Sequence, residues 1–173
     1  MTLPKLTMVL GGAASGKSAF AEALVLQAGI SPLYVATAQA FDDEMSVKIR
    51  RHQARRGDDW DTVEEPFELA TFLGTLDETR IVLIDCATLW LTNIILDHRD
   101  IAAETTALIS ALRVCAAPVV IVSNEVGYGI VPENALARNF RNAQGTLNQS
   151  IAAEADRVIA VMAGLPIALK GQL

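Results

Sequence analysis

The sequence is poor in cysteine and in long apolar runs, and each shortage excludes a class of protein. Its two cysteines, Cys86 and Cys115, fit no metal or redox spacing and are expected to be buried thiols in a reducing compartment. No stretch reaches the ~18 uninterrupted apolar residues of a membrane helix. The richest stretch, 158–169, is broken by Gly164 and Pro166. Since the N-terminus also lacks a signal-peptide pattern, the sequence predicts a cytoplasmic protein with no stable membrane span.

Basic residues are a minority as well. The chain has 14 Lys and Arg against 20 Asp and Glu, a net charge of −6 at pH 7. Nucleic-acid binding favours a basic surface, so no nucleic-acid partner is expected. With 173 residues, of which 51% are hydrophobic and 20% charged, the composition predicts one globular domain spanning 1–173.

Apolar runs alternate with helical patterns along the chain. Several apolar runs are continuous, which is typical of strands buried on both faces. The alternation predicts an α/β fold with a mostly parallel sheet, helices on both faces, and ligands at the carboxyl ends of the strands. Strands are expected at 6–10, 33–36, 62–64, 81–85, 119–123, 158–162 and 167–169. Helices are expected at 17–27, 42–56, 66–76, 89–96, 102–115 and 133–156.

One octet between the first strand and the first helix reads G-x-x-x-x-G-K-S. It consists of Gly11, Gly12, Ala13, Ala14, Ser15, Gly16, Lys17 and Ser18. In such a P-loop, backbone N–H groups face an anion, the lysine adds a charge for the β- and γ-phosphates, and the serine hydroxyl holds Mg²⁺. The context therefore predicts a P-loop NTPase-type (RecA-like) fold that binds a nucleoside triphosphate. The motif alone does not identify the base or the use of the phosphate.

The strand expected at 81–85 consists of four apolar residues that end in Asp85. In a P-loop protein this is the pattern of the strand whose aspartate lies beside the P-loop and orients Mg²⁺. Many buried strands also end in aspartate at a turn, so the pattern is weak by itself. The P-loop favours the metal role.

His52 lies in the stretch 48–56, which holds five of the 14 basic residues. A basic island in an acidic protein is typical of a surface that faces phosphate. Neutral imidazole is a competent nucleophile toward phosphorus, and neighbouring cations lower its pKa. The alternative is a solvated basic helix face with a bystander histidine, which the local sequence by itself favours.

Three further features remain open. The stretch 123–129 closes a buried strand with polar residues and two glycines, which suits either a binding loop or a plain tight turn. Arg138 and Arg141 share a helix face and either bind phosphate or lie on the surface. Glu64 either contacts a ligand or is a surface carboxylate. His98 is interpreted as an exposed loop residue with no role.

The chain resembles, nearly end to end, the bifunctional adenosylcobinamide kinase / adenosylcobinamide-phosphate guanylyltransferase family. The block from Asn124 to Asn134 is unusual among P-loop proteins and makes the resemblance specific. The other matching segments are Gly11–Ser18, Tyr34–Gln39, Asp42–Met45, Arg51-His52 with Arg55, Arg56 and Trp60, Asp85-Cys86, Leu89–Asn93 and Gly164–Pro166.

The resemblance implies that His52 becomes guanylylated, which reverses the local preference for a bystander. It implies that Lys17 acts in catalysis and that Ser18 and Asp85 are positioned for Mg²⁺. Further nucleotide contacts are implied at Ala36, Thr37, Ala38, Gln53, Ala54, Arg55, Arg56 and Glu64, besides the P-loop and Asp85. Some relatives carry Glu where this chain has Asp85, and Gly57 stands where Pro is expected.

Two reactions follow from the resemblance. A nucleoside triphosphate, ATP or GTP, first phosphorylates the hydroxyl on the aminopropanol arm of adenosylcobinamide. GMP from GTP then passes through His52 to the cobinamide phosphate and gives adenosylcobinamide-GDP. Relatives are typically trimers, so a homo-oligomer is expected, and residues of a neighbouring subunit could complete the corrinoid site.

Two other functions compete with this one. A small-molecule kinase without the transferase step would tolerate removal of His52. A GTP-binding regulatory protein would turn over slowly without a small-molecule substrate. The absence of an Asn-Lys-x-Asp guanine-reading motif counts against a Ras-like switch.

Overall fold

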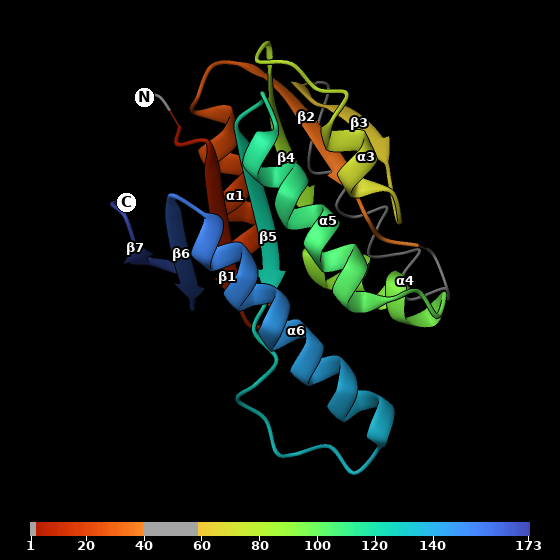
Figure 1. Ribbon diagram of the computed structural model, residues 1–173. Helices are drawn as coiled ribbons and strands as arrows, with labels where there is room; N and C mark the ends of the chain where they lie inside the picture. Colours follow the sequence, from red (N-terminus) through yellow and green to blue (C-terminus); the bar gives the residue numbers. More distant parts are fainter. Residues whose placement is uncertain (1–2, 40–58) are drawn as a thin grey trace.

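The computed structural model describes residues 3–39 and 59–173, and these form a seven-stranded sheet in the order β3-β2-β4-β5-β1-β6-β7 (Figure 1). Every neighbouring pair is parallel except β6 and β7. All seven expected strands are confirmed. Their bounds are β1 Leu6–Gly11, β2 Ser31–Ala36, β3 Asp61–Glu64, β4 Arg80–Asp85, β5 Val119–Asn124, β6 Arg157–Met162 and β7 Leu165–Lys170.

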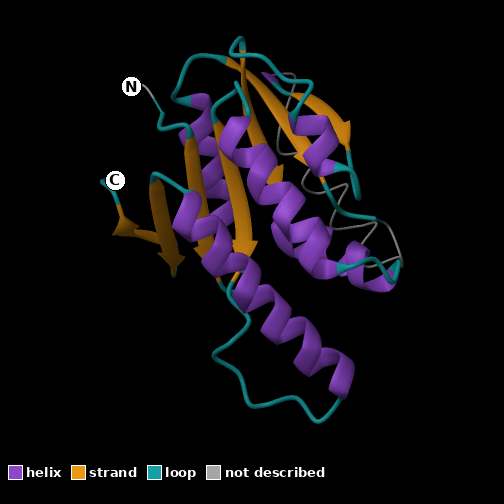
Figure 2. Ribbon diagram, viewed as in Figure 1, coloured by secondary structure: helices purple, strands orange, loops and turns teal. Residues whose placement is uncertain are grey.

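Helices cover both faces of this sheet, as expected (Figure 2). Helix α1 packs on one face, and α3, α4, α5 and α6 pack on the other. The helix expected at 42–56 lies outside the described residues. The bounds are α1 Lys17–Leu26, α3 Leu69–Leu73, α4 Ala87–Leu96, α5 Ile101–Val114 and α6 Ala135–Glu154.

The helix expected at 66–76 is wrong in its extent, since α3 covers only Leu69–Leu73. The Glu65 carboxylate accepts hydrogen bonds from the backbone N–H groups of Phe67 (3.1 Å) and Glu68 (2.8 Å) and holds this segment in a turn. The Pro66 carbonyl accepts a hydrogen bond from Asn93 Nδ2 at 3.0 Å instead of one from a helical turn. Local side-chain bonds thus compete with the helix at its start.

The sheet separates two hydrophobic clusters. Alternate residues of β4 belong to opposite clusters: Ile81 and Leu83 face α1, whereas Val82 and Ile84 face the other helices. All four are fully buried. Burying each such side chain is worth roughly 1.5–3 kcal/mol. The continuous apolar run in the sequence therefore reflects a central strand covered on both faces.

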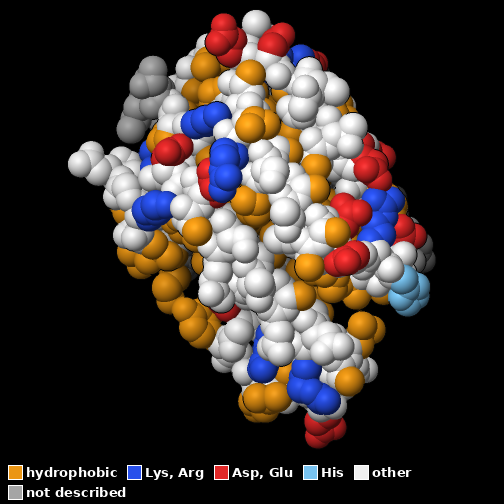
Figure 3. Space-filling model, in the orientation of Figure 1, with side chains coloured by type: hydrophobic (Ala, Val, Ile, Leu, Met, Phe, Trp, Pro, Cys, Tyr) orange, Lys and Arg blue, Asp and Glu red, His pale blue; other side chains and the backbone are white. Residues whose placement is uncertain are grey.

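The β6–β7 hairpin forms the far edge of the sheet. Ala163 and Gly164 have φ values of 52° and 79°, the left-handed pair that a tight two-residue hairpin turn requires. The side chains of Leu165, Ile167 and Leu169 on β7 are exposed. Figure 3 shows hydrophobic side chains gathered along this edge. Among the described residues, no helix has the length and apolar character needed to cross a membrane.

Candidate active site

The P-loop joins the end of β1 to the start of α1. Its turn is closed by a hydrogen bond from the Ser15 N–H to the Gly12 carbonyl at 3.3 Å. Ala14 (φ 55°) and Gly16 (φ 94°) both adopt the left-handed conformation. Such turns direct successive backbone N–H groups into one concavity, and the N-terminus of α1 adds its positive end. The segment is thus built as an anion site.

Glycine is required at two P-loop positions by close packing. A Cβ atom on Gly11 would lie 2.5 Å from Ser15 Oγ and 2.6 Å from the Val161 carbonyl. A Cβ atom on Gly16 would lie 3.1 Å from the Cα of Gly164. The Gly164 N–H also donates to the Ser15 carbonyl at 2.8 Å. The β6–β7 turn therefore buttresses the P-loop, a contact between distant segments that sequence reasoning missed.

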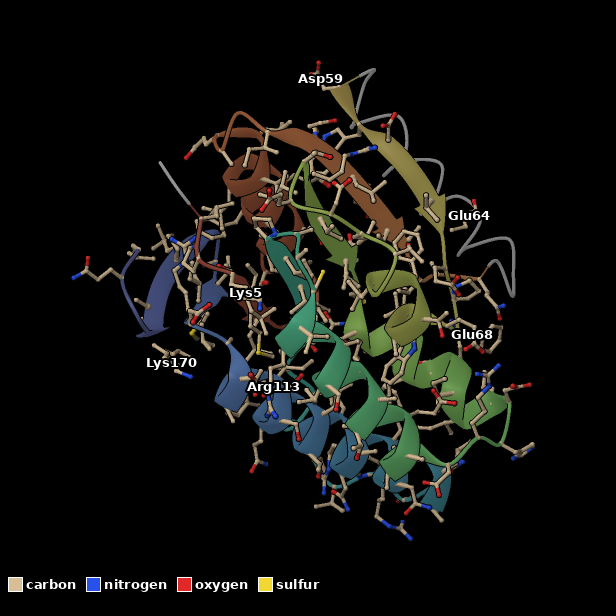
Figure 4. All side chains as sticks on the ribbon, turned by 45° about the horizontal axis from the view of Figure 1, so that its top comes forward. Lys5, Asp59, Glu64, Glu68, Arg113 and Lys170 are labelled. Carbon is tan, nitrogen blue, oxygen red and sulfur yellow. The ribbon has the colours of Figure 1, made fainter. Side chains whose placement is uncertain are left out.

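Strand register brings the predicted site residues to one edge of the sheet. Glu64, Ala36 and Asp85 are successive partners across β3, β2 and β4. Gly11 is the partner of Asn124 across β1 and β5. Figure 4 shows Glu64 at the carboxyl end of β3, at the outer edge of this row. The described part of the predicted nucleotide site thus draws on four parallel strands, β1, β2, β3 and β4.

Asp85 and Lys17 lie at the same corner of the site, although β4 and the P-loop strand β1 are not neighbours. Burial and, to a smaller extent, the Asp85 carboxylate raise the pKa of the Cys86 thiol, the Lys17 ammonium opposes them, and the net pKa is about 11. Both charged groups therefore act on one thiol. Strand β5 lies between β4 and β1, so Asp85 is one strand further from the P-loop than a neighbouring strand would place it.

Hydrogen bonds orient both charged groups. The Tyr34 hydroxyl donates to Asp85 Oδ2 at 2.7 Å, and Lys17 Nζ donates to the Gly12 carbonyl at 3.1 Å. Tyr34 is itself buried and makes an edge-to-face contact with Trp60, with ring centroids 5.9 Å apart. Trp60 thus packs against the tyrosine whose hydroxyl orients the Asp85 carboxylate.

Thr37 is enclosed by protein partners. Its hydroxyl donates to the Cys86 carbonyl and accepts from the Cys86 N–H, both at 2.8 Å. Its carbonyl accepts a hydrogen bond from Asn93 Nδ2 at 2.8 Å. These bonds join the end of β2 to the end of β4. The hydroxyl of Thr37, a residue predicted to contact nucleotide, holds the two strand ends together.

A buried polar network lies under the end of β5. Ser123 Oγ donates to Asn148 Oδ1 (2.6 Å), and Gln144 Nε2 donates to both Ser123 Oγ (3.0 Å) and Asn148 Oδ1 (2.9 Å). Asn148 Nδ2 then donates to the Asn124 carbonyl at 3.0 Å. Sequence reasoning missed Gln144 and Asn148. The available signal was their spacing of four residues, which places both on the helix face that also carries the apolar residues Leu147 and Ile151.

Other predicted residues are not brought into this corner by the described structure. Arg138 donates to the carbonyls of Pro132 and Glu133, so it binds its own loop. His98 is exposed just after α4. Within 3–39 and 59–173, no group of three or more acidic, histidine or cysteine side chains could hold a metal ion. The predicted site residues His52, Gln53, Ala54, Arg55 and Arg56 lie outside the described residues.

Comparison with known families assigns the chain. A family model described as "Cobinamide kinase / cobinamide phosphate guanyltransferase" matches residues 7–169. The chain belongs to this family. Membership confirms the resemblance, and the family description agrees with the kinase and guanylyltransferase class that the sequence predicts.

Two curated relatives match across nearly the whole chain. The bifunctional adenosylcobalamin biosynthesis protein CobP of Pseudomonas aeruginosa is 45% identical over 168 residues, covering 95% of this chain and 97% of that protein. The bifunctional adenosylcobalamin biosynthesis protein CobU of Escherichia coli is 40% identical over 179 residues, covering 94% and 98%.

Two solved structures share the fold at low sequence identity. The RadB recombinase superposes with a TM-score of 0.55 at 18% identity, covering 91% of this chain and 74% of that chain. The flagellar accessory protein FlaH of Methanocaldococcus jannaschii gives 0.53 at 13% identity, covering 97% and 80%. At this level of sequence identity, these likenesses confirm the RecA-like fold alone.

Proposed function

We propose that the chain phosphorylates adenosylcobinamide and then transfers GMP from GTP to the product, giving adenosylcobinamide-GDP. The names of the curated relatives and the family description support this function. The structural observation that carries it is the corner where the P-loop, Lys17 and Asp85 come together. We also propose that residues 1–173 form one catalytic domain.

In the kinase step, the substrate hydroxyl attacks the γ-phosphorus of ATP or GTP, and the bond to the β–γ bridging oxygen breaks. The P-loop N–H groups and the Lys17 ammonium stabilise charge on the β- and γ-phosphates. The Gly12 carbonyl holds Lys17 Nζ at 3.1 Å across the loop. Phosphate oxygens offer the ammonium a stronger, charge-assisted hydrogen bond than this neutral carbonyl does.

The donors at this corner fit Mg²⁺. The Ser18 hydroxyl and the Asp85 carboxylate are oxygen ligands, and Mg²⁺ at nucleotide sites takes only one or two protein ligands besides phosphate and water. A bound Mg²⁺ would neutralise charge on the phosphates. Tyr34 holds one Asp85 oxygen at 2.7 Å, which fixes the direction of the carboxylate.

In the transferase step, His52 attacks the α-phosphorus of GTP. A phosphorus–nitrogen bond forms, the bond to the α–β bridging oxygen breaks, and pyrophosphate leaves. An oxygen of cobinamide phosphate then attacks the same phosphorus and releases the histidine. Gln53, Ala54, Arg55 and Arg56 are proposed nucleotide contacts in this step. Ala36, Thr37, Ala38 and Glu64, at or just after the ends of β2 and β3, are proposed as further contacts.

The remaining expectations concern assembly and location. We propose a homo-oligomer, with a trimer as in the family, and a cytoplasmic protein. The two free cysteines, which are buried, agree with a reducing compartment.

The decisive experiment follows label from the α-phosphate of GTP into the protein, with Mg²⁺ and without corrinoid. Wild type should become labelled, and the bond should be acid-labile and alkali-stable, as a phosphoramidate is. His52→Ala should remain unlabelled. His98→Ala is the matched control, because it removes the other histidine of the chain and leaves His52 intact. Unlabelled wild type under conditions where GTP binds would overturn the transferase.

A second assay separates the kinase from the transferase. Label in the γ-phosphate should pass to adenosylcobinamide in both wild type and His52→Ala. If cobinamide is phosphorylated but the wild-type protein is never guanylylated, the chain is a small-molecule kinase without the transferase step. Slow hydrolysis that is indifferent to the corrinoid would leave a regulatory nucleotide-binding protein.

A further inference from the structure

A pocket of about 170 Å³ lies where the chain that leaves β2 meets α4. Its lining residues are Gln39, just after β2, Phe67, just before α3, and Asn93, Leu96 and Asp97, on α4 and at its end. Phe67 and Leu96 supply apolar walls, so the other three side chains set the polar chemistry of the pocket. None of the five is a proposed nucleotide contact.

Asn93 is the most deeply buried residue of the polar three, with 2% of its surface exposed. Its Nδ2 donates to the Thr37 carbonyl at 2.8 Å and to the Pro66 carbonyl at 3.0 Å. Both amide hydrogens are thus used, and exchanging oxygen and nitrogen would set the oxygen against two other acceptors. The surroundings therefore fix the orientation of this carboxamide, and Oδ1 is the polar atom that it has left for the pocket.

This Oδ1 atom of Asn93 is buried and has no hydrogen-bond partner within the described residues. A carboxamide oxygen only accepts, so the group that satisfies it must donate an N–H or O–H. Native structures rarely leave such an atom unpaired, because its desolvation is costly. The pocket therefore suits a ligand group that donates hydrogen bonds.

Asp97 adds a second acceptor to the pocket. Arg99 Nε donates to Asp97 Oδ2 at 2.8 Å, which leaves Oδ1 for a ligand. Because Arg99 also bonds Glu68 at 2.6 Å, its guanidinium is engaged by carboxylates and offers a phosphate no unpaired charge. Gln39 contributes a carboxamide that both donates and accepts. Two acceptors beside a donor match a neutral primary carboxamide, whose NH₂ group donates and whose oxygen accepts.

The pocket and the proposed nucleotide contacts of β2 and β3 lie on opposite faces of the sheet. Ala36 packs against the cluster on the α1 side. Val63 packs on the other side, so side-chain alternation turns its neighbour Glu64 toward α1 as well. Phe67 of the pocket packs instead against the cluster that α3 and α4 cover. A nucleotide bound along these strand ends therefore leaves the pocket to the second substrate.

We propose that this pocket binds a carboxamide side chain of the corrinoid substrate. The inference rests on the proposed function in taking that substrate as cobinamide, a corrin ring whose rim carries acetamide and propionamide groups. The amide NH₂ group donates to Asn93 Oδ1 and Asp97 Oδ1, and its oxygen accepts from Gln39 Nε2. The methylene stem of the side chain contacts Phe67 and Leu96.

Strand order sets the distance between this pocket and the P-loop. Strands β4 and β5 lie between β2 and β1, so the axes of β2 and β1 are about 14 Å apart. A corrin ring with its side chains spans such a distance. The aminopropanol arm can therefore reach the phosphates at the P-loop while a carboxamide on another part of the ring occupies the pocket.

The first test measures the binding of cobinamide and of a non-hydrolysable GTP analogue separately, by calorimetry. Asp97→Ala should raise the dissociation constant of cobinamide about tenfold or more, the effect of one hydrogen bond to a charged group, and change that of the analogue by less than about twofold. Leu96→Trp, at an exposed position, should fill the pocket and weaken cobinamide at least as much. Glu68→Ala is the matched control, because it also takes a carboxylate from Arg99 but does not line the pocket. It should bind both ligands as wild type does.

A change in the ligand tests the direction of the hydrogen bonds. A cobinamide analogue with methyl esters in place of its primary carboxamides keeps the carbonyl oxygens but loses the N–H donors. Wild type should bind this ester about tenfold or more weakly than cobinamide, and Asp97→Ala should bind it as wild type does. An ester that binds wild type as tightly as cobinamide, or that is as sensitive to Asp97→Ala, would contradict donation to the pocket.

Three results of the first test would overturn the proposal. Weakening of the GTP analogue alone would assign the pocket to the nucleotide, and no change in either ligand would leave it to ordered water. Equal losses in Asp97→Ala and Glu68→Ala would assign the effect to Arg99. Labelling of wild type from the α-phosphate of GTP needs no corrinoid and separates this inference from the proposed function. A labelled wild type with any of these three results would overturn the pocket alone, whereas a wild type that is neither labelled nor binds cobinamide would overturn both.

Discussion

The end of β5 and the loop that follows it, 125–134, differ in burial and in the range of their hydrogen bonds. At the strand end, Ser123 is fully buried and Asn124 is bonded through both backbone groups. A few residues later, the side chains of Tyr128 and Ile130 are 94% and 97% exposed. In Figure 1 the loop and the first turns of α6 extend beyond the sheet. The strand end is shaped by tertiary contacts, whereas the loop presents large apolar groups to its surroundings.

Local polar bonds give the loop its shape. The Glu125 carboxylate accepts from the Gly127 N–H at 2.5 Å, and Arg138 bonds the Pro132 carbonyl at 2.9 Å. Asn134 caps α6 by accepting from the N–H of Leu136 at 2.7 Å. Exposed apolar patches on proteins commonly mark sites of interaction. The comparison therefore separates a strand end held by bonds between distant segments from a loop held by local bonds.

The largest effect is expected on activity, at Lys17 of the P-loop. Lys17→Ala should lower kcat for cobinamide phosphorylation by roughly 10²–10³, because it removes a fixed positive charge from the transferring phosphoryl group. Transfer of γ-label to cobinamide measures this loss. Lys5→Ala is the control, since Lys5 is exposed, lies at the other end of β1 from the P-loop, and donates to the Arg113 carbonyl at 2.6 Å. Equal activity of the Lys17 variant and the control would contradict a role of Lys17 in phosphoryl transfer.

The enclosed thiol of Cys86 should make stability depend on pH. The pKa of Cys86 is about 11 in the folded chain and about 9 when exposed, so its contribution is complete below pH 9 and is lost as pH rises toward 11. The free energy of unfolding should fall by about 3 kcal/mol over this window, less in Cys86→Ala. Urea unfolding at several pH values measures it.

Cys115→Ala is the control for this titration. The pKa of Cys115 is raised as well, chiefly by burial, but less strongly than that of Cys86. The Cys115 variant should therefore retain most of the alkaline loss. An identical pH profile in the wild type and Cys86→Ala would contradict the enclosure of the thiol.

A smaller effect is expected from the support of the strand end. Thr88→Val keeps the shape of the side chain but leaves the Asn124 N–H without its acceptor, which should cost about 1–3 kcal/mol of unfolding free energy. Thr106→Val, at an exposed position of α5, removes a hydroxyl that donates to the Ala102 carbonyl of the preceding turn. This change should lower the unfolding free energy by less than about 0.5 kcal/mol. Equal costs would show that the network adds nothing beyond local bonding.

The smallest effect is expected in the loop. Ile130→Ser should change the unfolding free energy of the chain by less than about 0.5 kcal/mol, because the side chain is 97% exposed. Thermal melting at several protein concentrations tests this. A destabilisation that depends on concentration would instead show that another subunit covers Ile130.

Much of the fold and of the phosphate site could be predicted from local patterns. The continuous apolar runs predicted the central strands β1, β4 and β5, because a strand buried on both faces needs consecutive apolar residues. The octet from Gly11 to Ser18 predicted an anion site because its spacing encodes the turn geometry. The helix at 66–76 was wrong because Glu65 competes locally for the backbone, an effect that helical periodicity does not register.

The sequence by itself determined the strands, the P-loop chemistry and, through its resemblance, the family. Only the tertiary structure decided that β5 lies between β1 and β4, that Gly164 supports the P-loop, and that Asn148 fixes Asn124. The physical reason is range: turn geometry and burial leave a pattern within a few residues. The pairing of strands and helices depends on contacts between segments far apart in the chain, for which a single sequence carries no periodic signal.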